Sequence, residues 1–256
     1  MIHSERLLEI AGLRTIVVGA TDAPMAVVLL HGYAMKPEDL APFAHSLGVP
    51  ALFLLPRGPQ RCFDAGGYGW WDIDSEARDA ALLRGPRDLV EQYPPGLGAA
   101  RAALARFIEA LAAEYRPRCT VVGGFSQGGM LSLDFALRGS SPVDALVLMS
   151  ASRIARADWE PKRERLRGLP AFVSHGRSDQ DLAFTAGEAL RDFMLAGGAE
   201  VSWAPFEGGH ETPLLVWRGL RNFLGALLRS SQNGGGSRHP GGNSATTSAD
   251  KRMLKR

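Results

Sequence analysis

The chain has 256 residues, of which 45% are hydrophobic and 22% charged, and these values fit one large globular domain. No segment approaches the roughly 18 consecutive apolar residues of a transmembrane helix, and Cys62 and Cys119 are too few for a disulfide framework or a zinc cluster. The net charge of +2 is uneven: residues 230–256 carry five basic and one acidic side chain, which leaves about −2 for the rest and no basic, aromatic surface of the kind that binds nucleic acid.

Short apolar segments alternate with helical patterns along the chain. Residues 7–18 are predicted as one or two antiparallel edge strands. Six further segments have the apolar composition of strands: 26–30, 51–55, 120–123, 145–149, 171–174 and 201–204. Five amphipathic segments are predicted as helices: 37–47, 98–115, 127–137, 182–196 and 213–229. This alternation predicts an α/β fold with a mostly parallel, doubly wound sheet covered by helices on both faces.

Three segments interrupt this rhythm. Residues 57–95 are long and rich in Gly and Pro, and residues 150–168 form a second excursion with many charges. Both follow predicted strands, so we expect them at the carboxyl ends of the sheet, where α/β proteins bind ligands. Residues 230–256 are rich in Gly, Ser, Asn and Thr, which predicts a disordered basic tail after a folded domain of residues 1–229.

The sharpest local pattern is Gly124-Phe125-Ser126-Gln127-Gly128, between the predicted strand 120–123 and the predicted helix 127–137. A serine on such a strand–turn–helix corner exposes its hydroxyl above the sheet edge, and the residues two before and two after it must be small. Ser126 is therefore predicted to be a nucleophile.

A serine hydroxyl needs a base to take its proton and a carboxylate to orient that base. Asp179 follows the strand 171–174, and Asp181 is a nearby alternative that also suits the start of a helix. His210 lies on a Gly-rich loop after the strand 201–204. The order Ser, Asp, His along the chain predicts a triad of Ser126, Asp179 and His210.

The other histidines do not compete for the role of base. His3, His45 and His239 lie away from strand ends, whereas His31 and His175 each precede a glycine and suit a turn-holding role. No His pair or His–Glu spacing supplies a metal site, so a reaction without metal is expected.

Two backbone amides are expected to stabilise the oxyanion of a tetrahedral intermediate. One belongs to Gln127, directly after the nucleophile. The other is assigned to Tyr33, because Gly32 before it lets the backbone approach the substrate closely.

Several motifs together resemble the phospholipase/carboxylesterase family of the α/β-hydrolases, which includes bacterial carboxylesterases and acyl-protein thioesterases. The resemblance covers about residues 25–228 and is carried by Leu30-His31-Gly32, Leu55-Pro56-Arg57-Gly58-Pro59, Trp70-Trp71-Asp72, Gly124-Phe125-Ser126-Gln127-Gly128, His175-Gly176-Arg177-Ser178-Asp179 and Gly209-His210-Glu211. It implies an α/β-hydrolase fold and a serine hydrolase without metal or cofactor. It also maps Ser126, Asp179 and His210 onto the family's triad. Residues 65–95 and 230–256 depart from the family pattern.

The aromatic residues of the long loop are candidates for the substrate pocket. In the family, the stretch that matches Trp70-Trp71-Asp72 lies beside the acyl pocket, and we add Phe63 to Trp70 and Trp71 as expected lining. The alternative is that these aromatics cap the core under the loop. For Arg57 and Arg61, we expect a place on the surface; the alternative is that they bind an anionic substrate.

The motifs predict a serine hydrolase that works through an acyl-enzyme, and the family resemblance implies an esterase for short- to medium-chain acyl groups. Two enzyme alternatives are an acyl-protein thioesterase and a lysophospholipase, and a third is a noncatalytic ligand-binding protein on a hydrolase fold. The expected partner is a small-molecule ester or thioester, with no nucleic acid and no stable membrane insertion, and a homodimer is left open. Residues 1–10 lack the apolar core of a secretory signal, which favours a cytoplasmic location.

Overall fold

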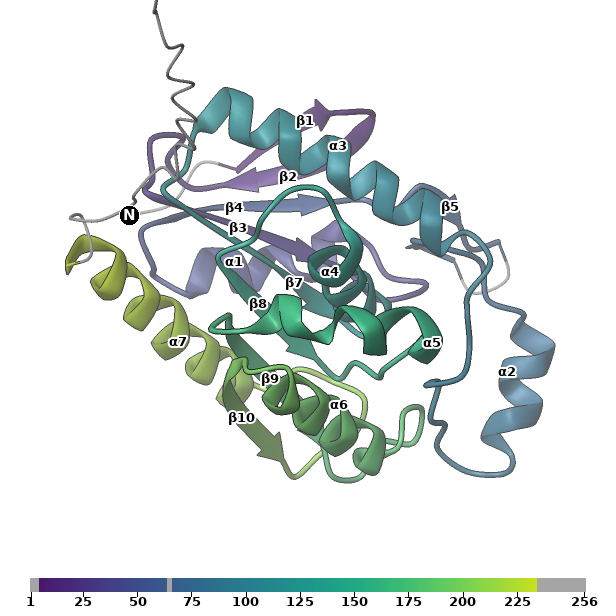
Figure 1. Cartoon of the computed structure of the whole chain (residues 1–256). Coiled ribbons are helices and arrows are strands. Elements are labelled where there is room, and N and C mark those ends of the chain that lie inside the picture. The colour runs from purple at the N-terminus through teal and green to yellow at the C-terminus, as the bar shows by residue number, and fades with distance from the viewer. Residues whose placement is uncertain (1–4, 64–65, 234–256) are drawn as a thin grey trace, which may run out of the picture.

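The structure is a computed structural model that describes residues 5–63 and 66–233, and its centre is an eight-stranded sheet (Figure 1). The strand order is β1-β2-β4-β3-β7-β8-β9-β10. The strands are Glu5–Ile10 (β1), Leu13–Val18 (β2), Met25–Leu30 (β3), Ala51–Pro56 (β4), Cys119–Phe125 (β7), Ala145–Met149 (β8), Pro170–Gly176 (β9) and Glu200–Phe206 (β10). Pairing is antiparallel from β1 to β2 and from β2 to β4, and parallel from β4 onward. The predicted mostly parallel sheet is confirmed.

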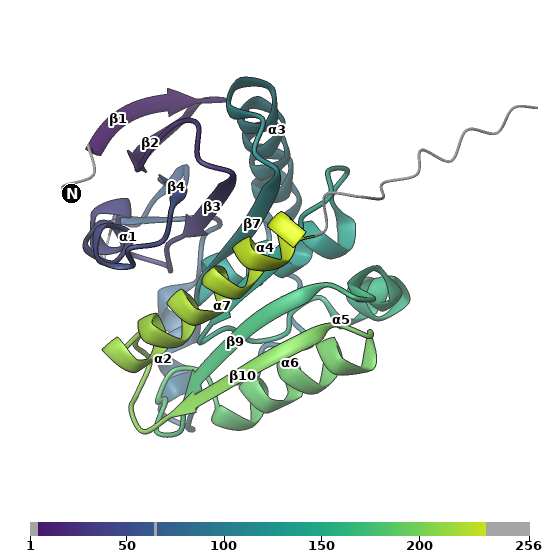
Figure 2. The same cartoon turned by 90° about the vertical axis from the view of Figure 1, so that its left-hand side faces the viewer.

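Helices cover both faces of this sheet (Figure 2). They are α1 (Ala41–Ser46), α2 (Ser75–Leu82), α3 (Leu97–Tyr115), α4 (Gln127–Arg138), α5 (Arg156–Trp159), α6 (Phe184–Ala196) and α7 (Leu214–Asn233), with 3₁₀ helices at Pro37–Asp39 and Glu160–Leu166. The helices α1 and α7 pack on one face, and α3, α4 and α6 pack on the other.

The two faces have separate hydrophobic cores because successive strand side chains point in opposite directions. In β3, Ala26, Val28 and Leu30 join the core under α3 and α4. Met25, Val27 and Leu29 join the core under α1 and α7. All six side chains are fully buried, which explains why the strand is apolar throughout instead of alternating.

Two predicted elements differ in detail from the structure. The predicted helix 37–47 is split into Pro37–Asp39 and α1, because Pro42 lacks the N–H that a continuous helix needs and its ring clashes with the preceding turn. The predicted loop 57–95 contains α2 and a two-stranded ribbon of Gln60–Arg61 (β5) and Tyr68–Gly69 (β6). Helix α2 begins after Asp74, whose Oδ1 accepts the Ala77 N–H at 2.9 Å.

The last helix extends the folded part of the chain beyond the predicted boundary at residue 229. Helix α7 runs through Asn233, because residues 230–233 hold no Gly or Pro and the first glycine comes at Gly234. The remainder of the predicted tail, 234–256, lies outside the described residues. Within the described part of the chain, no helix is both long enough and apolar enough to cross a bilayer.

Candidate active site

Ser126 lies at the corner between β7 and α4, where the backbone takes an uncommon conformation. Its φ is 51° and its ψ is −117°, values that a non-glycine residue adopts only under strain. A Cβ on either Gly124 or Gly128 would overlap the carbonyl oxygen of Leu30 in the neighbouring strand β3. The close passage of β3 therefore explains why both flanking residues are glycine.

The three residues predicted as a triad meet at the carboxyl ends of the strands. The Oγ of Ser126 lies 2.9 Å from Nε2 of His210, and Nδ1 of His210 lies 2.7 Å from Oδ2 of Asp179. Asp179 is buried, whereas Ser126 and His210 are partly exposed. The ring of Phe125 packs against His210 with its centroid 4.8 Å away. The hydrogen-bonded series therefore runs from a partly exposed hydroxyl on Ser126 to a buried carboxylate on Asp179.

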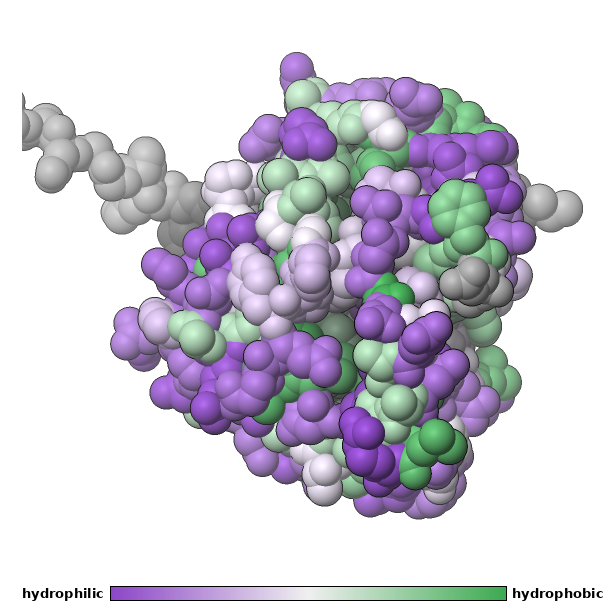
Figure 3. All heavy atoms as spheres, turned by 90° about the vertical axis from the view of Figure 1, so that its right-hand side faces the viewer, coloured by the Kyte–Doolittle hydropathy of each residue, from purple (hydrophilic) through white to green (hydrophobic). Residues whose placement is uncertain are grey.

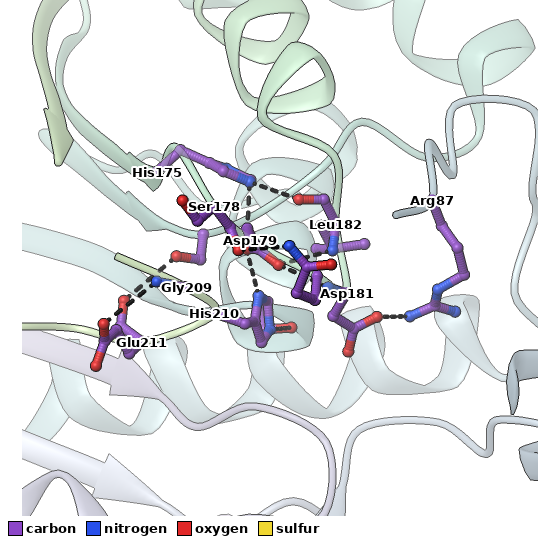
Figure 4. Close-up of polar contacts among 12 residues, drawn as sticks. Arg87, His175, Ser178, Asp179, Asp181, Leu182, Gly209, His210 and Glu211 are labelled. Atoms are coloured by element: carbon purple, nitrogen blue, oxygen red, sulfur yellow. Dashed lines mark hydrogen bonds and ion pairs between the residues drawn. The ribbon is translucent and has the colours of Figure 1, made fainter. Parts of the chain in front are cut away.

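The carboxylate of Asp179 is held in its charged form. Burial alone raises its pKa, but hydrogen bonds from His175, His210 and the Leu182 N–H outweigh burial and hold the pKa well below its usual range. Its Oδ1 accepts the N–H groups of Asp181 and Leu182 at 2.8 and 2.9 Å. The carboxylate therefore presents one oxygen to its own turn and the other to His210 (Figure 4).

Asp181, the alternative acid, is occupied elsewhere. Its carboxylate accepts a hydrogen bond from Arg78 at 2.6 Å. It also pairs with Arg87 (Figure 4). Burial raises the pKa of Asp181, and the hydrogen bonds from Arg78 and Arg87 lower it by more, so it stays charged. The structure brings Asp179, not Asp181, into contact with His210.

The loop after β3, expected to supply one oxyanion donor, is held by His31. The buried ring accepts the Gly58 N–H at Nε2 (2.9 Å) and donates from Nδ1 to the Gly32 carbonyl (2.7 Å). Burial lowers the pKa of His31 to about 4, so the ring is neutral and can both donate and accept. Tyr33, next along this loop, lines the same cavity as Ser126 and Gln127.

A role for the side chain of Gln127 was missed by sequence reasoning, which considered only its backbone amide. The side-chain oxygen accepts the Trp70 N–H at 2.8 Å, and the side-chain nitrogen donates to the Trp71 carbonyl at 2.9 Å. Trp70 in turn donates from its ring nitrogen to the His31 carbonyl at 2.9 Å. No local sequence signal points to this role, because both partners of the buried amide lie more than 50 residues away along the chain.

A cavity of about 690 Å³ opens over Ser126 and His210. Much of its lining is apolar: Met35, Leu40 and Phe43 come from the segment after β3, and Leu89, Met130 and Ile154 come from other elements. Helix α2 borders it with Ala77, Arg78 and Ala81. Figure 3 faces this end of the molecule and shows hydrophobic side chains at the bottom of a hollow ringed by hydrophilic ones.

The prediction of the aromatic lining is corrected in two places. Trp71 borders the cavity, but Trp70 is a core residue with 1% exposure, because its ring nitrogen is bound to the His31 carbonyl. Phe63 is 83% exposed and packs with Arg61, 5.4 Å from the ring centroid to the guanidinium carbon. Arg57 stacks on Tyr68 in the same way at 4.4 Å, outside the cavity lining.

Within the described residues, no group of three or more His, Cys, Asp or Glu side chains is placed to hold a metal ion. Cys62 and Cys119 are both buried thiols. The chemistry that this site offers is that of a hydroxyl, an imidazole and a carboxylate in series, next to a largely apolar cavity.

Comparison with known proteins places the chain in a family. The family model described as Phospholipase/Carboxylesterase matches residues 11–228. Acyl-protein thioesterase 1 of Neurospora crassa is 26% identical over 181 residues, which cover 67% of this chain and 72% of the relative. Among solved structures, esterase PE8 is 25% identical with a TM-score of 0.68, and the match covers 85% of this chain and 98% of the esterase chain. Zea mays acyl-protein thioesterase 2 is 21% identical with a TM-score of 0.66, and the match covers 84% of this chain and 99% of the thioesterase chain.

Proposed function

The chain belongs to the phospholipase/carboxylesterase family of the α/β-hydrolases, and from this premise we propose that it cleaves carboxylic esters of short- to medium-chain acids through a covalent acyl-enzyme on Ser126. That it is a hydrolase of the carboxylesterase and thioesterase family follows from the match over residues 11–228. The assignment of Ser126, His210 and Asp179 as the triad rests on their two contacts of 2.9 and 2.7 Å.

In the acylation step, Ser126 Oγ attacks the carbonyl carbon of the ester while its proton passes to Nε2 of His210. Asp179 keeps the other proton of the imidazole on Nδ1 and stabilises the imidazolium that forms. The bond to the leaving group then breaks, and His210 gives its proton to the departing oxygen. Water repeats the sequence on the acyl-enzyme, with His210 again as the base.

The amides of Tyr33 and Gln127 are proposed to bind the oxyanion of both tetrahedral intermediates. Gln127 is the first residue of α4, so its N–H belongs to the unsatisfied first turn of a helix, where negative charge is favoured. Such donors are each worth roughly a hundred- to a thousand-fold in rate.

The deciding experiment compares wild type with Ser126→Ala on a nitrophenyl ester and with a fluorophosphonate probe. We expect the wild type to turn over the ester and take up the probe, and Ser126→Ala to do neither while keeping its circular dichroism spectrum. Retained turnover in Ser126→Ala would refute the proposal. An unlabelled, inactive wild type would favour the ligand-binding alternative.

An acyl-protein thioesterase is the second candidate, favoured by the Neurospora crassa relative and by the largely apolar cavity of about 690 Å³. The two candidates share the triad and differ in the acyl chain and in the leaving atom. Matched oxygen esters and thioesters of increasing acyl length separate them. A kcat/KM that peaks at short or medium oxygen esters supports the esterase, and one that rises with long-chain thioesters supports the thioesterase.

A further inference from the structure

His175 lies against the proposed triad, but the mechanism above does not use it. It is the penultimate residue of β9 and is fully buried. Its Nε2 lies 3.0 Å from the carbonyl oxygen of Leu182 and 3.3 Å from Oδ2 of Asp179 (Figure 4). The second contact is to the same oxygen that receives Nδ1 of His210.

The surroundings of the ring determine which nitrogen carries the hydrogen. A backbone carbonyl and a charged carboxylate can only accept, so both contacts of Nε2 require a hydrogen on that atom. Nδ1 is buried and finds no hydrogen-bond partner among the described residues. A ring with its only hydrogen on Nδ1 would bury an unsatisfied donor and lose both contacts of Nε2, so the tautomer with hydrogen on Nε2 is favoured.

Packing holds the ring in this orientation. Helix α6 passes so close that a Cβ on Gly187 would overlap Nδ1 of His175. Phe184, at the start of α6, presents its ring edge-on with the centroids 6.2 Å apart. The ring has little room to turn, so Nε2 stays 3.0 Å from the Leu182 carbonyl oxygen and 3.3 Å from Oδ2 of Asp179.

We propose that His175 is a positioning residue that donates a hydrogen bond to Asp179 and thereby fixes both the direction and the basicity of the proposed triad acid. The carboxylate then accepts from two imidazoles at Oδ2 and from two backbone amides at Oδ1. Four N–H groups leave it no second orientation. This inference rests on the proposed function, since it gives Asp179 its role in the reaction.

The chemical consequence is a carboxylate that shares its charge between two rings. Without the donor from His175, Asp179 would hold the proton on the imidazole of His210 more tightly, and the base would become available only at higher pH. The other charged groups beside this pair are Asp181, which is neutralised by Arg78 and Arg87, and Glu211 on the loop of His210. A substitution of His175 leaves all of these charged side chains in the protein.

The first test needs no substitution. Nitrogen NMR of the ¹⁵N-histidine-labelled wild type reads the protonation of each ring nitrogen directly. We expect Nε2 of His175 to carry a hydrogen in the active enzyme. A ring protonated on Nδ1 alone could not donate to Asp179 and would overturn the proposal.

The second test compares His175→Gln, whose amide nitrogen can replace the Nε2–H donor, with His175→Met, which has similar bulk and no donor. We expect His175→Met to lower kcat roughly ten-fold, the worth of one charge-assisted hydrogen bond, at an unchanged KM, and to move the acid limb of the kcat/KM profile to higher pH. His175→Gln should recover most of both effects.

Equal impairment of the two variants, or an acid limb that stays in place in His175→Met, would show a merely structural role. If His175→Met fails to fold, the wild-type NMR measurement decides. Failure of the proposed function is seen separately: an active Ser126→Ala refutes the triad, whereas an inactive Ser126→Ala with normal His175 variants refutes only the role of His175.

Discussion

His31 connects the loop after β3 to Gly58 and does so as a neutral ring, which makes the stability of the protein depend on pH. Burial lowers the pKa of His31 from 6.5 to about 4. Between these values the unfolded chain binds a proton that the folded chain excludes, so the free energy of unfolding falls as pH drops through this window. The loss at the acid end is on the order of 3 kcal/mol.

The measurement is urea unfolding at several pH values in wild type and in His31→Gln, which keeps an acceptor for the Gly58 N–H but cannot titrate. We expect the difference in pH slope between the two proteins to be confined to the interval from 6.5 down to about 4. Identical slopes would mean that His31 is not held neutral by burial.

The side-chain amide of Gln127, the residue after Ser126, bonds at its oxygen to Trp70 and at its nitrogen to Trp71. Gln127→Glu keeps the acceptor for the Trp70 N–H and replaces the donor to the Trp71 carbonyl by a second oxygen. An unsatisfied buried acceptor costs about 1–3 kcal/mol, and because Trp71 lines the cavity, KM for the ester should rise.

Thermal melting and steady-state kinetics test this, with Gln92→Glu as the control. Gln92 borders the same cavity and is exposed, so the same chemical change there should leave the melting temperature and KM nearly unchanged. Equal effects of the two substitutions would point to added negative charge as the cause and not to the lost hydrogen bond.

At the scale of the element, helix α2 is attached to the molecule differently from the helices that cover the sheet. None of its residues is buried, and Arg78 ties it to Asp181, two residues beyond Asp179 on the same turn. Because α2 also borders the cavity, a looser α2 should weaken substrate binding.

We therefore expect Arg78→Met to speed amide hydrogen exchange within Ser75–Leu82 and to raise KM more than it lowers kcat. Arg84→Met serves as the control, since Arg84 is an exposed arginine just after the same helix. Unchanged exchange in Arg78→Met would show that backbone contacts, such as that of the Arg87 N–H with the Asp181 carbonyl, are sufficient to hold the segment.

The sequence predicts the sheet well and this segment poorly, and the reason is physical. A strand such as β3 is buried on both faces, so its composition alone identifies it. No residue of helix α2 is buried, so its composition does not identify it, and its sequence signal is the N-cap residue Asp74. At the site, chain order and placement after strands predict Asp179 and His210, with Asp181 as an alternative to Asp179. The side-chain hydrogen bonds of Gln127 to Trp70 and Trp71 depend on distances that no local pattern contains.

At the scale of the whole molecule, one sheet separates two hydrophobic cores, and α7 closes one of them. Its buried side chains Val216, Trp217, Leu220, Phe223, Leu224 and Leu228 pack under the sheet with those of α1. Since β3 contributes alternate residues to both cores, loss of one core exposes the back of the strands that carry the site. We expect the described part of the chain to unfold as one cooperative unit.

The folded domain should therefore end with α7, and two truncated chains test the position of this C-terminal boundary. A chain that ends at Asn233 removes a Gly-, Ser- and Thr-rich segment with few large apolar side chains, so it should keep the melting temperature and kcat/KM of the full chain. A chain that ends at Gly219 also removes Leu220, Phe223, Leu224 and Leu228, each worth about 1.5–3 kcal/mol of burial. That sum is comparable with the 5–15 kcal/mol that holds a typical domain together, so the shorter chain should be unfolded by circular dichroism at room temperature. A folded chain ending at Gly219, or a destabilised one ending at Asn233, would place the boundary of the domain elsewhere.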